Sequence, residues 1–332
     1  MSSGDRWRRP TSADVAREAG LSRATVSYVL NDTPHQRIPE ETRRRVVEAA
    51  SRLGYTPSPA ARALRSGRSD VILCLLPDWP IGPAVGAFLE HLSEALAEAG
   101  LTLVAHPRVR SGRPVADLWR TIGPAAVLAL EEFDADDVAA MRAAGIEVTV
   151  ALRDARREGE LVLPEQRVGR LQAESLSVRG HRTIGYAFPD DTRLLGFATP
   201  RLDGVGAACA ELGLEPPVVC TVPLDPTRAG EAVERWRSRG VTGVAAYNDE
   251  VALAVLAGLR TRGLRAPTDL AVIGVDDIPA AALADPPLST VTVEQRAQAH
   301  YVARRVVAGL AGTPAPRRPP SDVIRLIARD SA

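Results

Sequence analysis

The sequence has no apolar run long enough to cross a bilayer, and its N-terminus carries no apolar leader. No stretch of about 18 consecutive apolar residues occurs among its 332 residues, which excludes a membrane-spanning helix. Arg6, Arg8 and Arg9 stand near the N-terminus, but no apolar segment follows them. We therefore expect no secretory signal peptide and a cytoplasmic protein. With 45% hydrophobic residues, the chain has the composition of a globular protein.

Cysteine and histidine are scarce and scattered. The three cysteines, Cys74, Cys209 and Cys220, are odd in number and far apart in the sequence, so we expect reduced thiols rather than a disulfide framework. The five histidines are equally dispersed, whereas a zinc site needs clustered Cys or His ligands. The sequence therefore predicts no metal site.

Lysine is absent, and all 41 basic residues are arginine. Codon usage is the simplest explanation for most of them, although the planar guanidinium group also suits bidentate binding to phosphate or guanine. Residues 1–68 hold 13 Arg and 7 acidic residues, a net charge of +6, and the remaining residues hold 28 Arg and 34 acidic residues, a net charge of −6. A basic head on an acidic body is typical of a chain that meets nucleic acid at one end.

The signatures of common enzymes are also missing. A dinucleotide-binding enzyme needs a glycine fingerprint after its first strand, but residues 76–80 read Leu-Pro-Asp-Trp-Pro. Gly204-Val205-Gly206 lacks the third glycine, and we expect it at a helix start after a loop. No Gly-x-Ser-x-Gly nucleophile motif occurs. We predict no catalytic residue, no enzymatic activity and no cofactor.

Residues 13–31 have the pattern of two short helices joined by a glycine turn. Apolar positions at 15, 16, 19, 26, 29 and 30 form one buried stripe on each helix, and Gly20 supplies the left-handed turn. Ser22 stands at the N-cap position of the second helix. The side chains that then point away from the core, toward a groove, are Arg23, Ala24, Ser27, Tyr28 and Asn31. The alternative interpretation is a chance helical corner within a larger bundle.

A third amphipathic helix favours the DNA-binding interpretation over the chance corner. It covers residues 39–53, with proline at its first turn and Glu40 and Glu41 at its positive end. Its apolar stripe consists of Val46, Val47, Ala50 and Leu53. Residues 54–68 are punctuated by proline, glycine and serine, which predicts a linker that is helical only when it is supported.

From residue 71 onward, apolar runs alternate with helical segments. This alternation predicts a doubly wound α/β sheet of parallel strands, and about nine strands are too many for one small sheet. We therefore predict two α/β subdomains that face each other across a cleft. The expected strands are residues 71–76, 101–105, 125–130, 147–151, 183–187, 217–220, 243–247 and 270–274.

The chain resembles the lac-repressor-like (LacI/GalR) family of bacterial transcription regulators along nearly its whole length. The motifs that carry the resemblance are Asp14-Val15-Ala16, Thr25-Val26-Ser27, Leu30-Asn31, Gly54-Tyr55-Thr56-Pro57, Ala61-Arg62-Ala63-Leu64, Gly180-His181-Arg182, Asn248-Asp249, Gly274-Val275-Asp276-Asp277 and Ala328-Arg329-Asp330-Ser331. A solute-binding protein of similar shape would lack the basic head. The resemblance implies an N-terminal all-α helix-turn-helix domain, joined by a hinge helix to a two-subdomain core like that of periplasmic binding proteins.

The resemblance also implies where the domains begin and end. We expect the helix-turn-helix domain at residues 10–56, the hinge helix and linker at 57–69, and the effector-binding and dimerisation core at 70–332. Within the core, the N-subdomain combines residues 70–163 with 291–319. The C-subdomain combines residues 164–290 with 320–332.

By the resemblance, the second helix docks in the major groove of operator DNA, and a homodimer reads an inverted repeat. The expected DNA contacts are Thr11, Ser22, Arg23, Ala24, Thr25, Ser27, Tyr28, Asn31, Ala61 and Leu64. Tyr28 stands where many relatives have arginine, so we expect a different base preference there. Leu64 is the expected wedge between base pairs in the minor groove, and its alternative role is a contact at the dimer interface.

Ligands of such sheets bind beyond the carboxyl ends of the strands. The expected ligand contacts are Asp78, Trp79, Asn248 and Asp276, which directly follow strands, and Arg201, which the resemblance adds. Asp249 and Asp277 stand beside these residues and are further candidates for ligand contact. The alternative is a structural role, in which Asp249 caps a helix and Asp277 caps a turn. Trp79 has the alternative role of filling an apolar edge. Residues 163–169 lack the Asp-Asn pair that many family members have there, which leaves the effector's identity open.

Hydroxyl-binding polar groups beside an aromatic ring suit a sugar. The sequence thus predicts a ligand-responsive repressor that binds a palindromic operator, with a carbohydrate as the expected class of effector. A corepressor-dependent regulator and a sensor of nucleobase-like molecules are the alternatives. The tail has no leucine heptads, so we expect a dimer rather than a tetramer.

Overall fold

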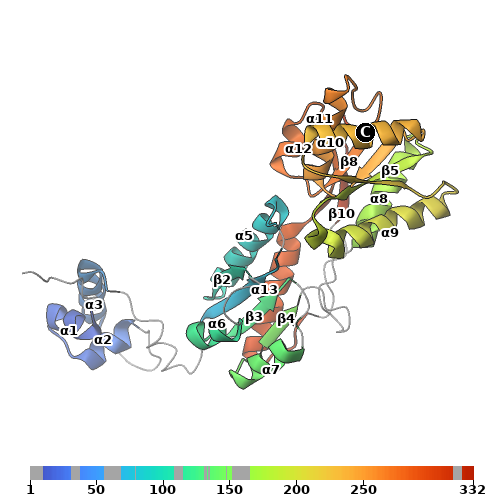
Figure 1. The fold of residues 1–332 in the computed structure, drawn as a ribbon. Helices are drawn as coiled ribbons and strands as arrows, with labels where there is room; N and C mark the ends of the chain where they lie inside the picture. The colour runs from blue at the N-terminus through green and yellow to red at the C-terminus, as the bar shows by residue number, and fades with distance from the viewer. Residues whose placement is uncertain are drawn as a thin grey trace, which may run out of the picture. The chain divides into compact units, whose positions relative to one another are not determined.

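The computed structural model describes residues 10–30, 38–55, 69–78, 80–107, 115–130, 133, 135–146, 148–151, 165–316 and 324–332. The chain divides into two compact units, Met1–Asp70 and Val71–Ala332. The first unit is helical, and the second contains two β-sheets with flanking helices, as predicted (Figure 1). Among the described helices, none combines the length and the apolar character needed to cross a membrane.

The first unit contains helices α1 (Ser12–Ala19), α2 (Arg23–Leu30) and α3 (Glu40–Leu53). The side chain of Asp14 accepts hydrogen bonds from the backbone N (2.8 Å) and Oγ1 (2.7 Å) of Thr11, which fixes the start of α1. Gly20 ends α1 in the left-handed conformation at φ 64°. The Oγ of Ser22 accepts a hydrogen bond from the backbone N of Thr25 at 3.0 Å, so Ser22 caps α2 as predicted.

The core of the first unit is made of small and β-branched side chains from all three helices. Val15, Val26, Val46 and Ala49 are completely buried. The prediction for Val47 was wrong, because this side chain is 52% exposed and Ala49 takes its place in the apolar stripe of α3. Small residues in these positions let three short helices close around one core.

The first sheet of the second unit is parallel throughout. Its strands, in spatial order, are β2 (Thr102–Pro107), β1 (Val71–Leu76), β3 (Ala126–Ala129) and β4 (Val148–Ala151). The helices that belong to it are α5 (Pro83–Glu98), α6 (Val115–Ile122), α7 (Ala135–Ala143) and α13 (Gln295–Ala311). Figure 1 shows α13 beside α5 in this part of the chain.

Strand β1 shows why the apolar runs of the sequence are uninterrupted. Ile72 and Cys74 pack on one side, in a cluster that includes Phe88 of α5. Leu73 and Leu75 belong to a separate cluster with Trp119 of α6 and Met141 of α7. Both faces of the strand are buried, so no polar alternation remains to be seen in the sequence.

The second sheet is larger and mixed. Its strands, in spatial order, are β10 (Ile324–Ile327), β9 (Ser289–Val293), β8 (Ala271–Val275), β7 (Gly243–Ala246), β5 (Ile184–Pro189) and β6 (Val218–Val222). The helical elements that belong to it are α8 (Glu165–Val178), the 3₁₀ helix η1 (Thr192–Leu194), α9 (Leu195–Glu211), α10 (Pro226–Ser238), α11 (Asp249–Thr261) and α12 (Pro279–Leu283).

The eight expected strands all occur, with ends that differ from the expected ones by at most two residues. The sequence patterns missed β9 and β10, and β10 runs antiparallel to β9, so the expectation of parallel strands throughout was wrong for this edge. The expected subdomain boundary at residues 290 and 291 falls inside β9, within the second sheet. The boundaries of the domains and subdomains stay predictions.

Two glycines let α8 and α9 cross with their backbones in contact. A Cβ atom on Gly169 would lie 1.9 Å from the carbonyl oxygen of Arg201, and one on Gly204 would lie 2.0 Å from the carbonyl oxygen of Gln166. Gly204 lies inside α9, not at a helix start as its sequence context had indicated. The close crossing brings the first turn of α8 next to the middle of α9.

We expect Gly204→Ala to destabilise the protein because its methyl group would overlap backbone atoms that cannot move independently. The cost should be on the order of 1–3 kcal/mol, measured by urea unfolding. Gly206→Ala is the matched control, since it lies on the same helix with nothing within 4 Å of an added Cβ. It should stabilise α9 by about 0.5–1 kcal/mol. Equal effects of the two substitutions would refute the close crossing as a packing constraint.

Candidate functional site

Helix α2 presents a mixed surface on the side opposite its core. Val26 and Val29 are buried, whereas Arg23, Ala24 and Tyr28 are exposed. The other expected contacts in the described part of the first unit divide by exposure: Thr11 and Ser22 are exposed, and Thr25 and Ser27 are partly buried. The exposed side chains combine a guanidinium, a methyl and a phenol, which can meet base edges and phosphates in a major groove.

A second arginine of this unit serves the fold rather than the exposed face of α2. Nη2 of Arg45, on α3, donates a hydrogen bond of 2.6 Å to the carbonyl oxygen of Ala19 at the end of α1. It thereby satisfies a terminal carbonyl next to the Gly20 turn. Arg45 thus links α3 to the turn between α1 and α2.

Four of the expected site residues lie outside the described residues: Asn31, Ala61, Leu64 and Trp79. Their expected roles in DNA binding and ligand binding stay predictions.

In the second unit, a cavity of about 150 Å³ lies where several strands of both sheets end. Its wall includes Leu130 after β3, Asn248 after β7 and Asp276 after β8. This is the edge at which ligands of α/β sheets bind. Three of the expected ligand contacts line this cavity: Arg201, Asn248 and Asp276.

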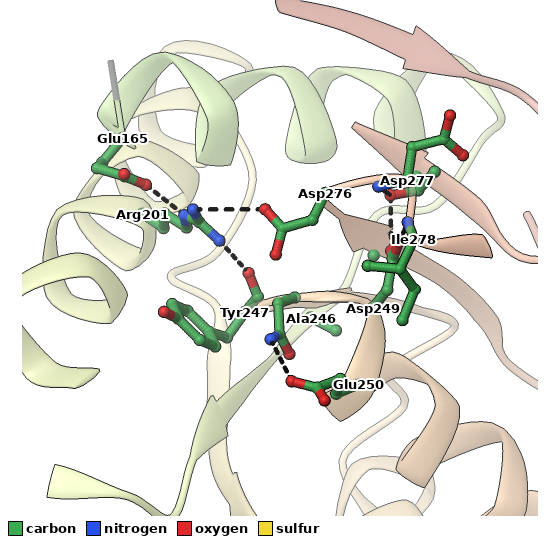
Figure 2. Close-up of polar contacts among 12 residues, drawn as sticks. Glu165, Arg201, Ala246, Tyr247, Asp249, Glu250, Asp276, Asp277 and Ile278 are labelled. Atoms are coloured by element: carbon green, nitrogen blue, oxygen red, sulfur yellow. Dashed lines mark hydrogen bonds and ion pairs between the residues drawn. The ribbon is translucent and has the colours of Figure 1, made fainter. Parts of the chain in front are cut away.

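Arg201 is the centre of the polar wall. Its Nε donates a short hydrogen bond to Glu165, and its Nη1 donates to the carbonyl oxygen of Tyr247 at 2.6 Å. Its Nη2 lies 4.0 Å from Oδ1 of Asp276, and its guanidinium carbon lies 4.8 Å from the centre of the Tyr247 ring. Figure 2 shows these contacts converging on one guanidinium group.

The charges of this cluster depend on one another. Burial alone would lower the pKa of Arg201, but the Glu165 and Asp276 carboxylates raise it above its usual value. Burial raises the pKa of Asp276, and the positive charge of Arg201 opposes that rise. Arg201 is only 7% exposed, so its charge is neutralised by protein groups instead of by bulk water.

Asp276 and Asp277 adopt backbone conformations that non-glycine residues rarely have. Their φ angles are 105° and 53°. Hydrogen bonds hold this strained turn: Asp277 accepts one of 2.6 Å from Nη2 of Arg329, and the backbone N of Asp276 donates one of 2.9 Å to the carbonyl oxygen of Val291. Figure 2 shows the carboxylate of Asp276 directed toward Arg201 and that of Asp277 directed away from it.

Asp249, the first residue of α11, lies next to this turn and is completely buried. Its carboxylate accepts hydrogen bonds from Oγ1 of Thr290 at 2.6 Å and from the backbone N of Ile278 at 2.9 Å. Burial raises its pKa to about 7, although these two hydrogen bonds lower it. The cap of α11 is Asn248, whose Oδ1 accepts from the backbone N of Val251 at 3.0 Å, so Asp249 is not the helix cap.

Asp78 lies outside the set of described residues that line the cavity. Its carboxylate is 3.7 Å from Nη1 of Arg193, which precedes α9. Sequence reasoning also missed polar members of the wall, above all Glu165, Glu250 and Gln298. For Glu165 the signal was the unusual segment 163–169; the other two lie on helices without a distinguishing local pattern.

Comparisons with known proteins agree with this architecture. The family described as bacterial regulatory proteins, lacI family, matches residues 11–58, and the periplasmic binding protein-like domain matches residues 173–332. The chain is 30% identical to the HTH-type transcriptional regulator CelR of Thermobifida fusca, covering 93% of this chain and 94% of CelR. It is 29% identical to MalR of Streptomyces coelicolor, covering 92% and 91% of the two chains.

Solved structures give the same result for the fold. The lac repressor dimer bound to operator and the anti-inducer ONPF matches with a TM-score of 0.79 and 22% identity, covering 98% of this chain and 99% of that one. A CelR–cellobiose complex matches with a TM-score of 0.64 and 27% identity, covering 98% and 100% of the two chains.

The raised pKa of Asp249 makes the stability of the core depend on pH. The folded state binds this proton more tightly than the unfolded state, so stability should fall as pH rises from about 4 to about 7 and should then level off. Asp249→Asn cannot ionise and should flatten this slope, which we expect to span on the order of 4 kcal/mol. Urea unfolding at a series of pH values measures it. A slope in the variant equal to that of the wild type would contradict the assignment.

Proposed function

The chain belongs to the lacI family of bacterial regulatory proteins and is a DNA-binding transcriptional regulator, and from this premise we propose that it is an effector-controlled repressor. It binds an inverted-repeat operator as a homodimer, in the cytoplasm, and a small molecule in the core cavity tunes its affinity for DNA. Regulators of this family are not enzymes. The proposal rests on one observation: the same chain has both an exposed face on α2 and a cavity lined by the buried Arg201.

The exposed residues at the start of α2 supply the sequence readout. Arg23 can form a bidentate pair with guanine, and Ala24 can contact a thymine methyl group. Tyr28, 39% exposed, offers a phenol to a base edge or a phosphate. The hinge residues Ala61 and Leu64 complete the contact in the minor groove, where Leu64 acts as the wedge.

The homodimer follows from the symmetry that an inverted repeat requires. The lac repressor in the matching structure is a dimer bound to operator.

The charge of the cavity indicates the class of the effector. Among the described residues, three carboxylates, those of Glu165, Glu250 and Asp276, line the cavity together with one guanidinium group, that of Arg201. An anionic ligand would face this excess of negative charge, so the effector is uncharged or cationic. A neutral sugar fits, because carboxylates and amides bind hydroxyl groups while Phe88 and Phe197 offer apolar surface. The matching CelR structure is a complex with such a sugar, cellobiose.

Selection of random duplexes by the full chain tests the DNA-binding proposal. At about 0.15 M salt, where non-specific binding is suppressed, we expect enrichment of an inverted repeat. Arg23→Ala should weaken binding to the selected operator about 10–100-fold, the loss typical of one bidentate base contact. The matched control is Arg44→Ala, which removes the same charge from α3, where Arg44 pairs with Glu41. Equal losses from both substitutions would assign Arg23 a general electrostatic role.

A pair of aspartate variants tests the effector site. Asp276→Asn keeps the shape of the cavity but removes the carboxylate that faces Arg201, so it should lower sensitivity to the effector at least about tenfold, as loss of a charge-assisted hydrogen bond does. Asp78→Asn should leave it unchanged, since Asp78 pairs with Arg193 instead. Release or gain of labelled operator DNA is measured with cellobiose, maltose, glucose, glucosamine, glucose 6-phosphate and adenine. A response to glucose 6-phosphate alone would contradict the proposal that the effector is uncharged or cationic.

A further inference from the structure

Gln298 lines the cavity with a hydrogen-bond donor that the protein does not satisfy. The side chain is buried, with the residue 1% exposed, and it belongs to the cavity wall. No hydrogen-bond partner for its Nε2 is found in the described part of the chain. Buried side-chain donors are nearly always paired, so this exception needs a physical explanation.

A second buried glutamine shows the ordinary arrangement of this donor. Nε2 of Gln172, on α8, lies 2.8 Å from the carbonyl oxygen of Ala246 and 3.0 Å from that of Ile273. Gln172 thereby ties α8 to the ends of β7 and β8. Each glutamine has one buried polar atom without a hydrogen-bond partner among the described residues, Oε1 of Gln172 and Nε2 of Gln298. The two differ in that the protein satisfies the amide donor of Gln172, whereas the unpaired donor of Gln298 belongs to a side chain that lines the cavity.

The place of Gln298 in the fold separates it from the charged side chains of the cavity wall. It lies on α13, which packs against α5 and β4 of the first sheet. Its neighbours in the cavity wall include the apolar side chains of Val85, Phe88 and Leu130. Arg201, Asn248 and Asp276, by contrast, belong to elements of the second sheet.

We propose that Gln298 is a specificity-determining residue whose amide donates a hydrogen bond to an acceptor oxygen of the effector. The effector spans the cavity, with hydroxyl or amino donors toward Asp276 and an acceptor toward Gln298. This inference rests on the proposed effector site and adds a chemical requirement to it. A molecule that lacks an acceptor at the α13 end leaves a buried donor unpaired and is rejected.

The hydrogen bond to Gln298 would connect the effector to the first sheet as well as to the second. Donors bound to Asp276 attach it to the second sheet, and the acceptor bound to Gln298 attaches it to α13 and the first sheet. A ligand so placed favours the relative orientation of the two sheets in which both contacts form.

The first test needs no effector. We expect Gln298→Leu to leave the melting temperature of the effector-free protein unchanged or to raise it, because the substitution removes an unpaired buried donor. Gln172→Leu, the matched control, leaves backbone carbonyls without a donor and should lower the melting temperature by at least about 4 °C. An equal fall in both variants would overturn the proposal and assign Gln298 a structural role.

The second test uses thermal shifts of the full chain with the six compounds named above. For a compound that stabilises the wild type, Gln298→Leu and Gln298→Glu should both weaken binding at least about tenfold, since neither side chain donates a hydrogen bond. Undiminished binding to both variants would overturn the role of Gln298 while leaving the effector site intact. Binding retained by Gln298→Glu alone would overturn the assignment of the donor.

The two tests also separate the proposals from each other. If none of the six compounds stabilises the wild type, the proposed class of effector fails. The effector-free comparison of Gln298→Leu with Gln172→Leu then still decides whether the protein itself satisfies the amide.

Discussion

The cavity depends on the interactions that the buried guanidinium group of Arg201 makes with neighbouring protein groups. A buried cation is tolerated only when protein groups replace its hydration, and here Glu165, the carbonyl of Tyr247 and Asp276 surround it. Glu165 reaches Arg201 because α8 and α9 cross at Gly169 and Gly204, where no Cβ atom would fit. Since a buried ion pair seldom stabilises a fold more than apolar residues would, the stability of the fold alone does not account for an ion pair at this cavity wall.

A second constraint holds Asp276 in position opposite that guanidinium group. Its strained turn is fixed by segments that are far apart in sequence, because Asp277 binds Arg329 and the backbone of Ile278 binds Asp249. Ser331 ties the C-terminal segment to the same sheet by donating a hydrogen bond of 2.7 Å to the carbonyl of Val272. Negative charge on Asp276 raises the pKa of Asp249, so the protonation of the buried carboxylate and the charge at the cavity wall are coupled.

The sequence predicted most of the architecture and only part of the cavity, for physical reasons. Strands such as β1 are visible because burial on both faces makes them continuous apolar runs. Strand β9, Ser-Thr-Val-Thr-Val, was missed because tertiary hydrogen bonds satisfy its buried hydroxyls, such as that from Oγ1 of Thr290 to Asp249. Glu165 and Gln298 were missed for a related reason, since helix crossing and helix position place them at the cavity and no local periodicity encodes either.

Effector control requires more than tight binding to the polar wall. A ligand with equal affinity for two conformations shifts no population between them, however strongly it binds. Contacts to Arg201, Asn248 and Asp276 all belong to the second sheet, so by themselves they would persist unchanged if the first sheet moved. Regulation therefore needs a contact with the first sheet, and Gln298 on α13 has the unpaired donor to make it. Whether such a ligand releases DNA or promotes its binding then follows from which orientation of the sheets lets the two hinge segments of a dimer meet the operator.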